Sequence, residues 1–169
     1  ARKDVMKFQQ SPTLTSLIVK YPGRRSQARG VGFMAHMDVV TAFRKDWVLD
    51  PFTLTEQDGY FIGRGTADNK AGVVGLAATF IKLKTAGYVP SRNMVLILTS
   101  DEETGMLAAN EFATTRLEEL DIEYAINSDG WSGVLTPDGE AYVYYVQGAE
   151  KNYQTFQVIV KNPGGHSSA

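Results

Sequence analysis

The stretch Met94-Val95-Leu96-Ile97-Leu98-Thr99 decides the fold, because it is almost entirely apolar and contains several β-branched side chains. A run of this length and composition predicts a strand that is buried on both faces of a sheet. Shorter runs at residues 31–35 and 124–127 predict two further strands. Between the runs at 31–35 and 94–99, apolar residues recur at helical spacing from 73 to 83, and the pattern stops at Gly87. Strands that alternate with helices in this way indicate α/β architecture.

The rest of the chain adds one helix and a different final section. A second helix is expected from about residue 105 to residue 117. From residue 141 onward the pattern changes, and residues 142–146 and 156–160 both have strand-like composition. Pro163-Gly164-Gly165 predicts a turn after the second of these strands.

The composition is that of a folded protein and excludes several classes. The 169 residues include 17 Lys or Arg, 19 Asp or Glu and 2 His, with a formal net charge of -2. Disordered, collagen-like and coiled-coil proteins have other compositions. The sequence contains 0 Cys, so disulfides and thiolate zinc clusters are excluded, and a metal site must use His, Asp and Glu. The charge balance gives no basic surface for nucleic acid, and no apolar stretch approaches the roughly 20 residues that cross a bilayer.

Acidic residues and a histidine lie just after the predicted strands. His36 and Asp38 follow the first strand, Asp101-Glu102-Glu103 follow the second, and Asp129 follows the third. In an open α/β sheet, ligands bind beyond the carboxyl ends of the strands. The sequence therefore predicts that three strands bring these side chains to one edge.

Each of these segments, taken alone, also has a purely structural explanation. His36 and Asp38 are spaced to share one side of an extended segment, where the carboxylate can accept from the second ring nitrogen of a metal-bound imidazole or be a metal ligand itself. They can equally form a simple hydrogen-bonded pair. The adjacent acids at 101–103 repel one another unless a cation neutralises them, or they cap the following helix.

Two glycine-containing segments leave similar alternatives. Residues 63–70 contain Asp68 where a dinucleotide fingerprint has Gly or Ala, and Ala71 follows Lys70 where a P-loop has Ser or Thr. Nucleotide binding is therefore excluded. What remains is a flexible glycine turn that presents Asp68 just before a helix, or an Asp68 that is simply the N-cap of that helix. Asn127-Ser128-Asp129-Gly130 is either part of the site or a simple turn. A serine hydrolase is disfavoured, since there is no Gly-x-Ser-x-Gly elbow.

Taken together and in order, these segments resemble the zinc-dependent exopeptidase and aminoacylase family of metallopeptidases, which includes glutamate carboxypeptidase, succinyl-diaminopimelate desuccinylase and the aminoacylases. The resemblance spans about residues 30–169. It is carried by six segments: residues 35–40, residues 47–52, residues 63–70, residues 99–105, Asp129, and residues 164–168.

The resemblance implies an α/β catalytic domain with a mixed twisted sheet flanked by helices, followed by the first strands of an α+β lid or dimerisation domain. The zinc-binding domain would occupy residues 1–148, incomplete, and the truncated lid domain residues 149–169. It also implies that the protein is a homodimer through the lid domain. The composition, as noted above, predicts no nucleic-acid or membrane partner.

The resemblance further implies a pair of zinc ions, with cobalt or manganese as substitutes, and a role for each site residue. Asp68 would bridge the two ions, His36 and Asp129 would complete the ligands of one, and Glu103 would bind the other. Glu102 would be the general base, and Asp38 would orient the zinc-binding His36. His166, from the lid domain, would stabilise the oxyanion.

The implied reaction is hydrolysis of the amide bond of a peptide or an N-acyl amino acid by a metal-activated water. Two other possibilities remain open at this stage. One is a non-catalytic metal-binding or dimerising module on the same scaffold, and the other is a calcium site made of carboxylates, in which His36 would have no part.

The ends of the chain and its histidine count add a further expectation. The sequence opens without Met and stops within a predicted turn, so we expect a fragment or a partly observed chain. The resemblance implies that it is the N-terminal part of a longer polypeptide. The family supplies its last zinc ligand from a C-terminal histidine, and His166 is the only histidine here besides His36. We therefore expect the 169-residue chain to be inactive alone. Cytoplasmic, periplasmic and secreted locations all remain open.

Overall fold

A computed structural model of the chain describes residues 4–24, 27–130, 133–149, 154–162 and 164–165. The chain forms two compact units, residues 1–131 and residues 132–169, each of which is described by itself. The elements of the first unit are β1 (Val5–Gln9), β2 (Thr15–Tyr21), β3 (Gly30–His36), the 3-10 turn η2 (Arg44–Asp46), β4 (Thr55–Gln57), β5 (Tyr60–Ile62), α1 (Lys70–Thr85), β6 (Met94–Thr99), α2 (Leu107–Glu111), η3 (Phe112–Arg116), α3 (Leu117–Glu119) and β7 (Ile122–Asn127).

The first unit contains a five-stranded mixed sheet in the order β1-β2-β6-β3-β7. β6 runs antiparallel to β2 and parallel to β3, and β3 runs parallel to β7. The register places His36 opposite Thr99 and Met34 opposite Asn127, so the carboxyl ends of β3, β6 and β7 lie side by side. The three strands expected from the sequence therefore meet at one edge, and the predicted mixed sheet flanked by helices is confirmed.

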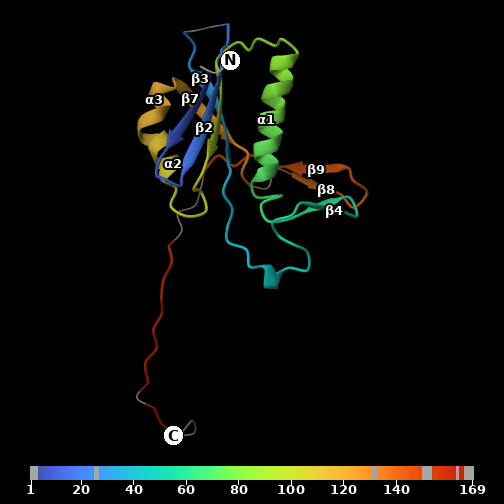
Figure 1. Cartoon of the computed structure of the whole chain (residues 1–169), viewed down its shortest axis with the longest axis vertical. Helices are drawn as coiled ribbons and strands as arrows, with labels where there is room; N and C mark the ends of the chain where they lie inside the picture. The colour runs from blue at the N-terminus through green and yellow to red at the C-terminus, as the bar shows by residue number, and fades with distance from the viewer. Residues whose placement is uncertain (1–3, 25–26, 131–132, 150–153, 163, 166–169) are drawn as a thin grey trace. The chain divides into compact units, whose positions relative to one another are not determined.

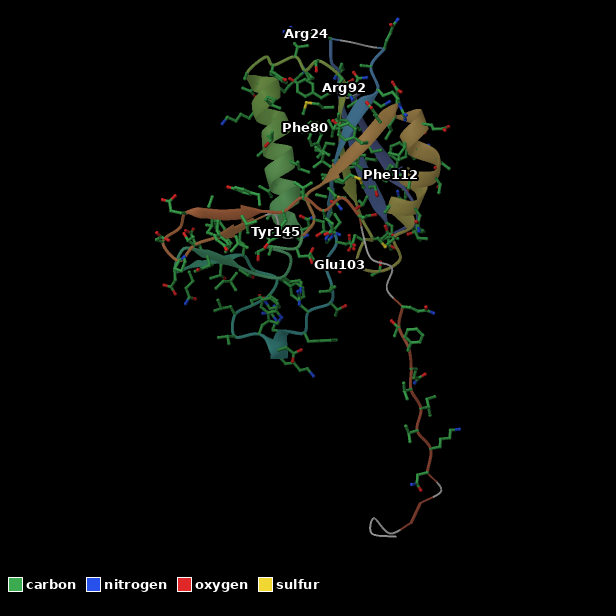
Figure 2. The ribbon with its side chains drawn as sticks, turned by 180° about the vertical axis from the view of Figure 1, so that it is seen from behind. Arg24, Phe80, Arg92, Glu103, Phe112 and Tyr145 are labelled. Atoms are coloured by element: carbon green, nitrogen blue, oxygen red, sulfur yellow. The ribbon has the colours of Figure 1, made fainter. Side chains whose placement is uncertain are left out.

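Helices cover both faces of this sheet (Figure 1). On one face, Val95 and Ile97 of β6 pack in a cluster with Ala108 and Phe112 from the α2–η3 segment. On the other face, Leu96 and Leu98 pack with Phe80 of α1. Figure 2 shows Phe80 and Phe112 on opposite sides of the sheet. Because β6 is buried on both faces, its sequence is continuously apolar instead of alternating.

Both predicted helices are present. α1 ends at Thr85, and Gly87 adopts a φ of 68°, a conformation that glycine tolerates best at a helix end. The second helix runs from Leu107 to Glu119 as three short stretches, two residues later than expected at each end. The buried carboxylate of Asp101 determines where it begins, because it accepts hydrogen bonds from the backbone N–H of Leu107 and Ala108 at 2.6 and 3.0 Å. None of the helices in the described residues is long and apolar enough to span a bilayer.

The second unit contains a hairpin of β8 (Gly133–Leu135) and β9 (Ala141–Tyr144). β9 corresponds to the strand expected at 142–146, one residue earlier at its start. The strand expected at 156–160 is not formed, so that prediction is wrong: residues 154–162 have no regular structure, and Phe156 is 78% exposed. Strand-like composition forms a strand only where another strand supplies hydrogen bonds, and none of the described residues pairs with this segment. The predicted boundary near Gly148 stays a prediction.

Candidate metal centre

His36 is the last residue of β3 and lies at the centre of the cluster. Its side chain is 2% exposed, and its Nε2 lies 2.7 Å from Asp68 Oδ1 and 3.6 Å from Asp129 Oδ2. Its Nδ1 lies 3.0 Å from the backbone carbonyl oxygen of Asp38. One ring nitrogen therefore faces two carboxylates while the other is held by backbone, an arrangement typical of metal-binding histidines.

Asp68 belongs to the loop between β5 and α1. The residue at the N-cap position of α1 is Asn69, not Asp68, and the Asp68 carboxylate lies against His36 Nε2. The peptide bond between Asp68 and Asn69 is cis. Lys70 Nζ donates to the carbonyl oxygen of Met37 at 2.7 Å, which ties this loop to the end of β3.

Asp38 connects the end of β3 to the loop after β6. Its two carboxylate oxygens accept hydrogen bonds from the backbone N–H of Glu102 and Glu103 at 3.1 and 2.9 Å. The nearest carboxylate oxygen lies 3.5 Å from His36 Nδ1, further away than the Asp38 carbonyl oxygen. Asp38 thus holds the histidine ring with its backbone and the acidic loop with its side chain.

The three adjacent acids after β6 have different environments. Asp101 is 1% exposed and holds the start of α2, as the capping alternative expected. Glu102 and Glu103 are half-buried and lie with His36 in one group. In Figure 2, Glu103 lies at the lower edge of the sheet, away from the turn that carries Arg92. Of the two explanations that the sequence left open, the helix cap therefore applies to Asp101 and the acidic site to Glu102 and Glu103.

Asp129 follows β7 in a short polar turn. The Asn127 side-chain oxygen accepts from the Asp129 backbone N–H at 3.2 Å. Ser128 donates both its backbone N–H and its hydroxyl to the carbonyl oxygen of Met34, each at 3.0 Å. The turn is therefore fixed to β3, two residues before His36. Sequence reasoning missed the part played by Ser128, although it stands between two residues that were singled out.

The structure brings together the predicted site residues that it describes. Two groups of three side chains share His36, and in each group the possible ligand atoms lie within 4.8 Å of one another: His36, Asp68 and Asp129 form one group, and His36, Glu102 and Glu103 form the other. One imidazole with several carboxylates is a donor set that suits zinc, cobalt or manganese better than calcium, which prefers oxygen ligands alone. His166 lies outside the described residues.

The electrostatics of the cluster shift two titrating groups. Burial alone would lower the pKa of His36, but the hydrogen bond to Asp68 and the charges of Asp129 and Asp38 outweigh it, so the pKa lies above its ordinary value. Burial raises the pKa of Glu102; the charge of His36 opposes this, and the neighbouring carboxylates add to the rise. The net rise for His36 comes from the carboxylates around it, whose charge a bound cation would neutralise, whereas the rise for Glu102 comes first from burial.

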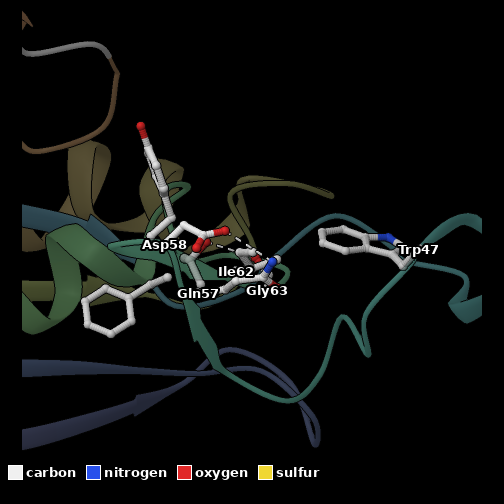
Figure 3. A pocket seen from close by; sticks show the side chains of 8 residues that line it. Trp47, Gln57, Asp58, Ile62 and Gly63 are labelled. Carbon is white, nitrogen blue, oxygen red and sulfur yellow. Dashed lines mark hydrogen bonds between the residues drawn. The ribbon is translucent and has the colours of Figure 1, made fainter.

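A shallow hollow of about 490 Å³ lies beside the β4–β5 hairpin (Figure 3). Its lining includes Trp47, Gln57, Tyr60 and Phe61, and none of the six described site residues. The Arg64 guanidinium lies over the Trp47 ring, 5.3 Å from its centroid. The carboxylate cluster, and not this hollow, holds the groups that can do chemistry.

Comparison with known proteins gives a consistent result. Residues 32–161 match the model of peptidase family M20/M25/M40. The chain is 31% identical over 139 residues to human N-fatty-acyl-amino acid synthase/hydrolase PM20D1, covering 80% of this chain and 28% of that protein. It is 35% identical over 134 residues to a probable succinyl-diaminopimelate desuccinylase of Staphylococcus aureus, covering 79% and 30% of the two chains.

Solved structures show the same fold. Human carnosine dipeptidase 1 matches with a TM-score of 0.66 at 28% identity, over 78% of this chain and 30% of that one. The M20 family metallo-carboxypeptidase Sso-CP2 of Sulfolobus solfataricus matches with a TM-score of 0.62 at 18% identity, over 80% and 30% of the two chains. The chain thus spans about 28–30% of the length of these relatives.

Proposed function

The chain belongs to peptidase family M20/M25/M40, and from this premise we propose that it carries the metal ligands and the general base of a hydrolase that cleaves the amide bond of a peptide or an N-acyl amino acid. The observation that carries the proposal is the pair of three-residue groups that share His36. The names of the relatives, an acyl-amino acid hydrolase, a desuccinylase and a dipeptidase, support this class of substrate.

The described residues fit a pair of zinc ions. In this proposal Asp68, which lies against His36 Nε2, would be the ligand that the two ions share, His36 and Asp129 would hold one ion, and Glu103 would hold the other. The pair of ions, when bound, polarises the scissile carbonyl and makes water acidic enough to lose a proton near neutral pH. The carboxylates also lose much of their mutual repulsion at such a site.

Glu102 then acts as the general base. It belongs to the group that contains His36 but is left over once the other acids are assigned to metal. Its carboxylate takes the proton from the attacking water and passes it to the nitrogen of the leaving amine. The hydrogen bonds from the Glu102 and Glu103 backbone N–H groups to Asp38 keep this loop in place during both transfers.

The arrangement of the longer protein is part of the same proposal. Residues 1–148 would belong to the catalytic domain, and a lid domain would begin at residue 149. His166 would stabilise the oxyanion from that lid, and the lid would also form a homodimer. These assignments derive from the resemblance noted from the sequence.

The test is to compare Glu102→Gln with His36→Ala. In the protein at its natural length, Glu102→Gln should lower kcat by about 100- to 10,000-fold while zinc content stays at that of the wild type. His36→Ala should lower zinc content as well, since it removes a ligand that the proposal assigns to one of the two ions. Unchanged turnover in Glu102→Gln refutes the assigned base. Zinc binding without any amide hydrolysis in the wild type would favour the non-catalytic module.

A further inference from the structure

The loops that carry Asp68 and Asp129 meet at the first turn of α1, at Gly72. A Cβ atom placed on Gly72 would lie 2.2 Å from Asn69 Oδ1 and 2.3 Å from Ser128 Oγ. Both distances are far below the 3.0 Å under which Cβ contacts essentially never occur. Asn69 directly follows Asp68, and Ser128 directly precedes Asp129. Glycine at position 72 therefore lets the neighbours of two candidate ligands approach the same point.

Neither of these side chains can easily move aside. The Ser128 hydroxyl is held by the hydrogen bond that it donates to the Met34 carbonyl oxygen on β3, and the Ser128 backbone N–H donates a second one to the same oxygen. Asn69 is 2% exposed, so its amide has no solvent-filled space to turn into. Its Nδ2 has no acceptor within the described parts of the chain, although buried donors are usually satisfied. A buried side chain with an unmet donor is unfavourable by itself, which points to a role in position rather than in stability.

We propose that Asn69, Gly72 and Ser128 form a positioning contact that sets the separation of Asp68 and Asp129 at His36, and thereby the affinity of this group for its metal ion. The proposal rests on the proposed function for the identity of the ligand. Asp68 and Asp129 lie 2.7 and 3.6 Å from the same His36 nitrogen, and metal sites require ligand placement within about 0.5 Å. Asn69 and Ser128 are positioning residues, because they act through the two aspartates.

The chain offers a matched pair of variants, Gly72→Ala and Gly75→Ala. Gly75 lies on the same helix three residues later, and a Cβ atom placed there meets nothing within 4 Å. Both changes raise helix propensity and restrict the unfolded chain to the same degree. They differ in whether the new methyl group crowds Asn69 and Ser128.

The first measurement is zinc affinity of the 169-residue chain by competition with a chromophoric chelator, with the visible spectrum of the cobalt(II) form beside it. Gly72→Ala should weaken zinc binding by about tenfold or more and change the cobalt spectrum, as loss of support around metal ligands does. Gly75→Ala should bind like the wild type. Equal affinity of the two variants overturns the proposal.

The second measurement needs no metal. With a chelator present, the imidazole nitrogen resonances of His36 report its contact with Asp68, and the chain has only 2 His to assign. Gly72→Ala should shift these resonances, and Gly75→Ala should leave them in place. Unchanged resonances in Gly72→Ala overturn the positioning contact even if zinc binds. A wild-type chain that binds no zinc overturns the proposed function instead.

Ser128→Ala tests the same contact without adding volume, so it answers the question if Gly72→Ala does not fold. It removes the hydroxyl that donates to Met34 and should loosen the turn that carries Asp129. Zinc affinity should fall and the His36 resonances should shift in the direction seen for Gly72→Ala. Unchanged affinity together with unchanged resonances removes Ser128 from the proposal and overturns it.

Discussion

Asp38 contacts both His36 and the acidic loop after β6. Its carbonyl oxygen faces His36 Nδ1, and its carboxylate holds the backbone of Glu102 and Glu103. One side chain at the end of β3 therefore fixes the loop that follows β6. The sequence predicted that Asp38 supports His36 but not that its carboxylate would hold the acidic loop, because only the register of β3 against β6 makes the two loops adjacent.

Asp38→Ala should destabilise the metal-free chain by about 1.5–3 kcal/mol, the usual effect of losing hydrogen bonds to a charged group. The free energy of unfolding in urea measures this loss. Asp46→Ala is the matched control, because Asp46 is exposed in η2 and its removal should cost less than about 0.5 kcal/mol. Equal losses in the two variants would contradict the role assigned to Asp38.

The metal-free chain should also lose stability as the pH rises above neutrality. The pKa of His36 is raised above 6.5 in the folded chain, so the folded state holds a proton that the unfolded state releases. This stabilisation is fully present below about pH 6.5, the ordinary pKa of His, and is lost as pH rises through the folded-state pKa. Urea unfolding at a series of pH values, with a chelator present, measures it. A pH dependence in this window that is identical in His36→Gln would contradict the assignment.

At the scale of elements, the buried central strand was the easiest part to predict and the edge strands were the hardest. β6 is apolar on both faces and was identified from composition alone. β1 and β2 were missed because apolar and polar residues do not alternate cleanly in them: Val5 of β1 is exposed, and Ser16 of β2 is buried. β4 and β5 were also missed, although Asp58-Gly59 between them is a strong hairpin signal, and both residues adopt positive φ.

The sequence could not predict which of Asp101, Glu102 and Glu103 would hold the start of α2 and which would lie in the group around His36. The three side chains are adjacent carboxylates, so the sequence alone predicts metal binding equally well for each of them. The path of the loop determines their different contacts. The Asp101 carboxylate accepts from the backbone N–H of Leu107 and Ala108, whereas the backbone N–H groups of the next two residues donate to Asp38. Such a choice depends on tertiary packing between α2 and β6.

Two isoleucines test how far the core extends. Ile97→Val removes one methylene from a side chain that is 0% exposed in β6, so it should cost about 0.5–1.5 kcal/mol. Ile159→Val makes the same change at a side chain that is 65% exposed, so it should cost less than about 0.5 kcal/mol. Urea unfolding of both variants measures the difference. A larger loss at Ile159 would mean that residues 156–160 are buried after all.

At the scale of the whole molecule, the 169-residue chain should bind zinc without hydrolysing amides. It spans about 28–30% of the length of its relatives, and the proposed assignment gives the second ion only Asp68 and Glu103 among the described residues. Zinc analysis after dialysis, with assays on dipeptides and N-acyl amino acids, tests this expectation. Chelator-sensitive hydrolysis by the purified chain would contradict it.

The order of strands also has a consequence for how the chain folds. β3 pairs with β6 and β7, so residues near the start of the chain must find partners about 60 to 90 positions away. Closing such long loops costs chain entropy before any strand contact repays it, which makes this step slow. His36 and Asp129 become neighbours only after it. In a refolding experiment, zinc capture should therefore follow helix formation and mark the moment when the parallel strands have found their register.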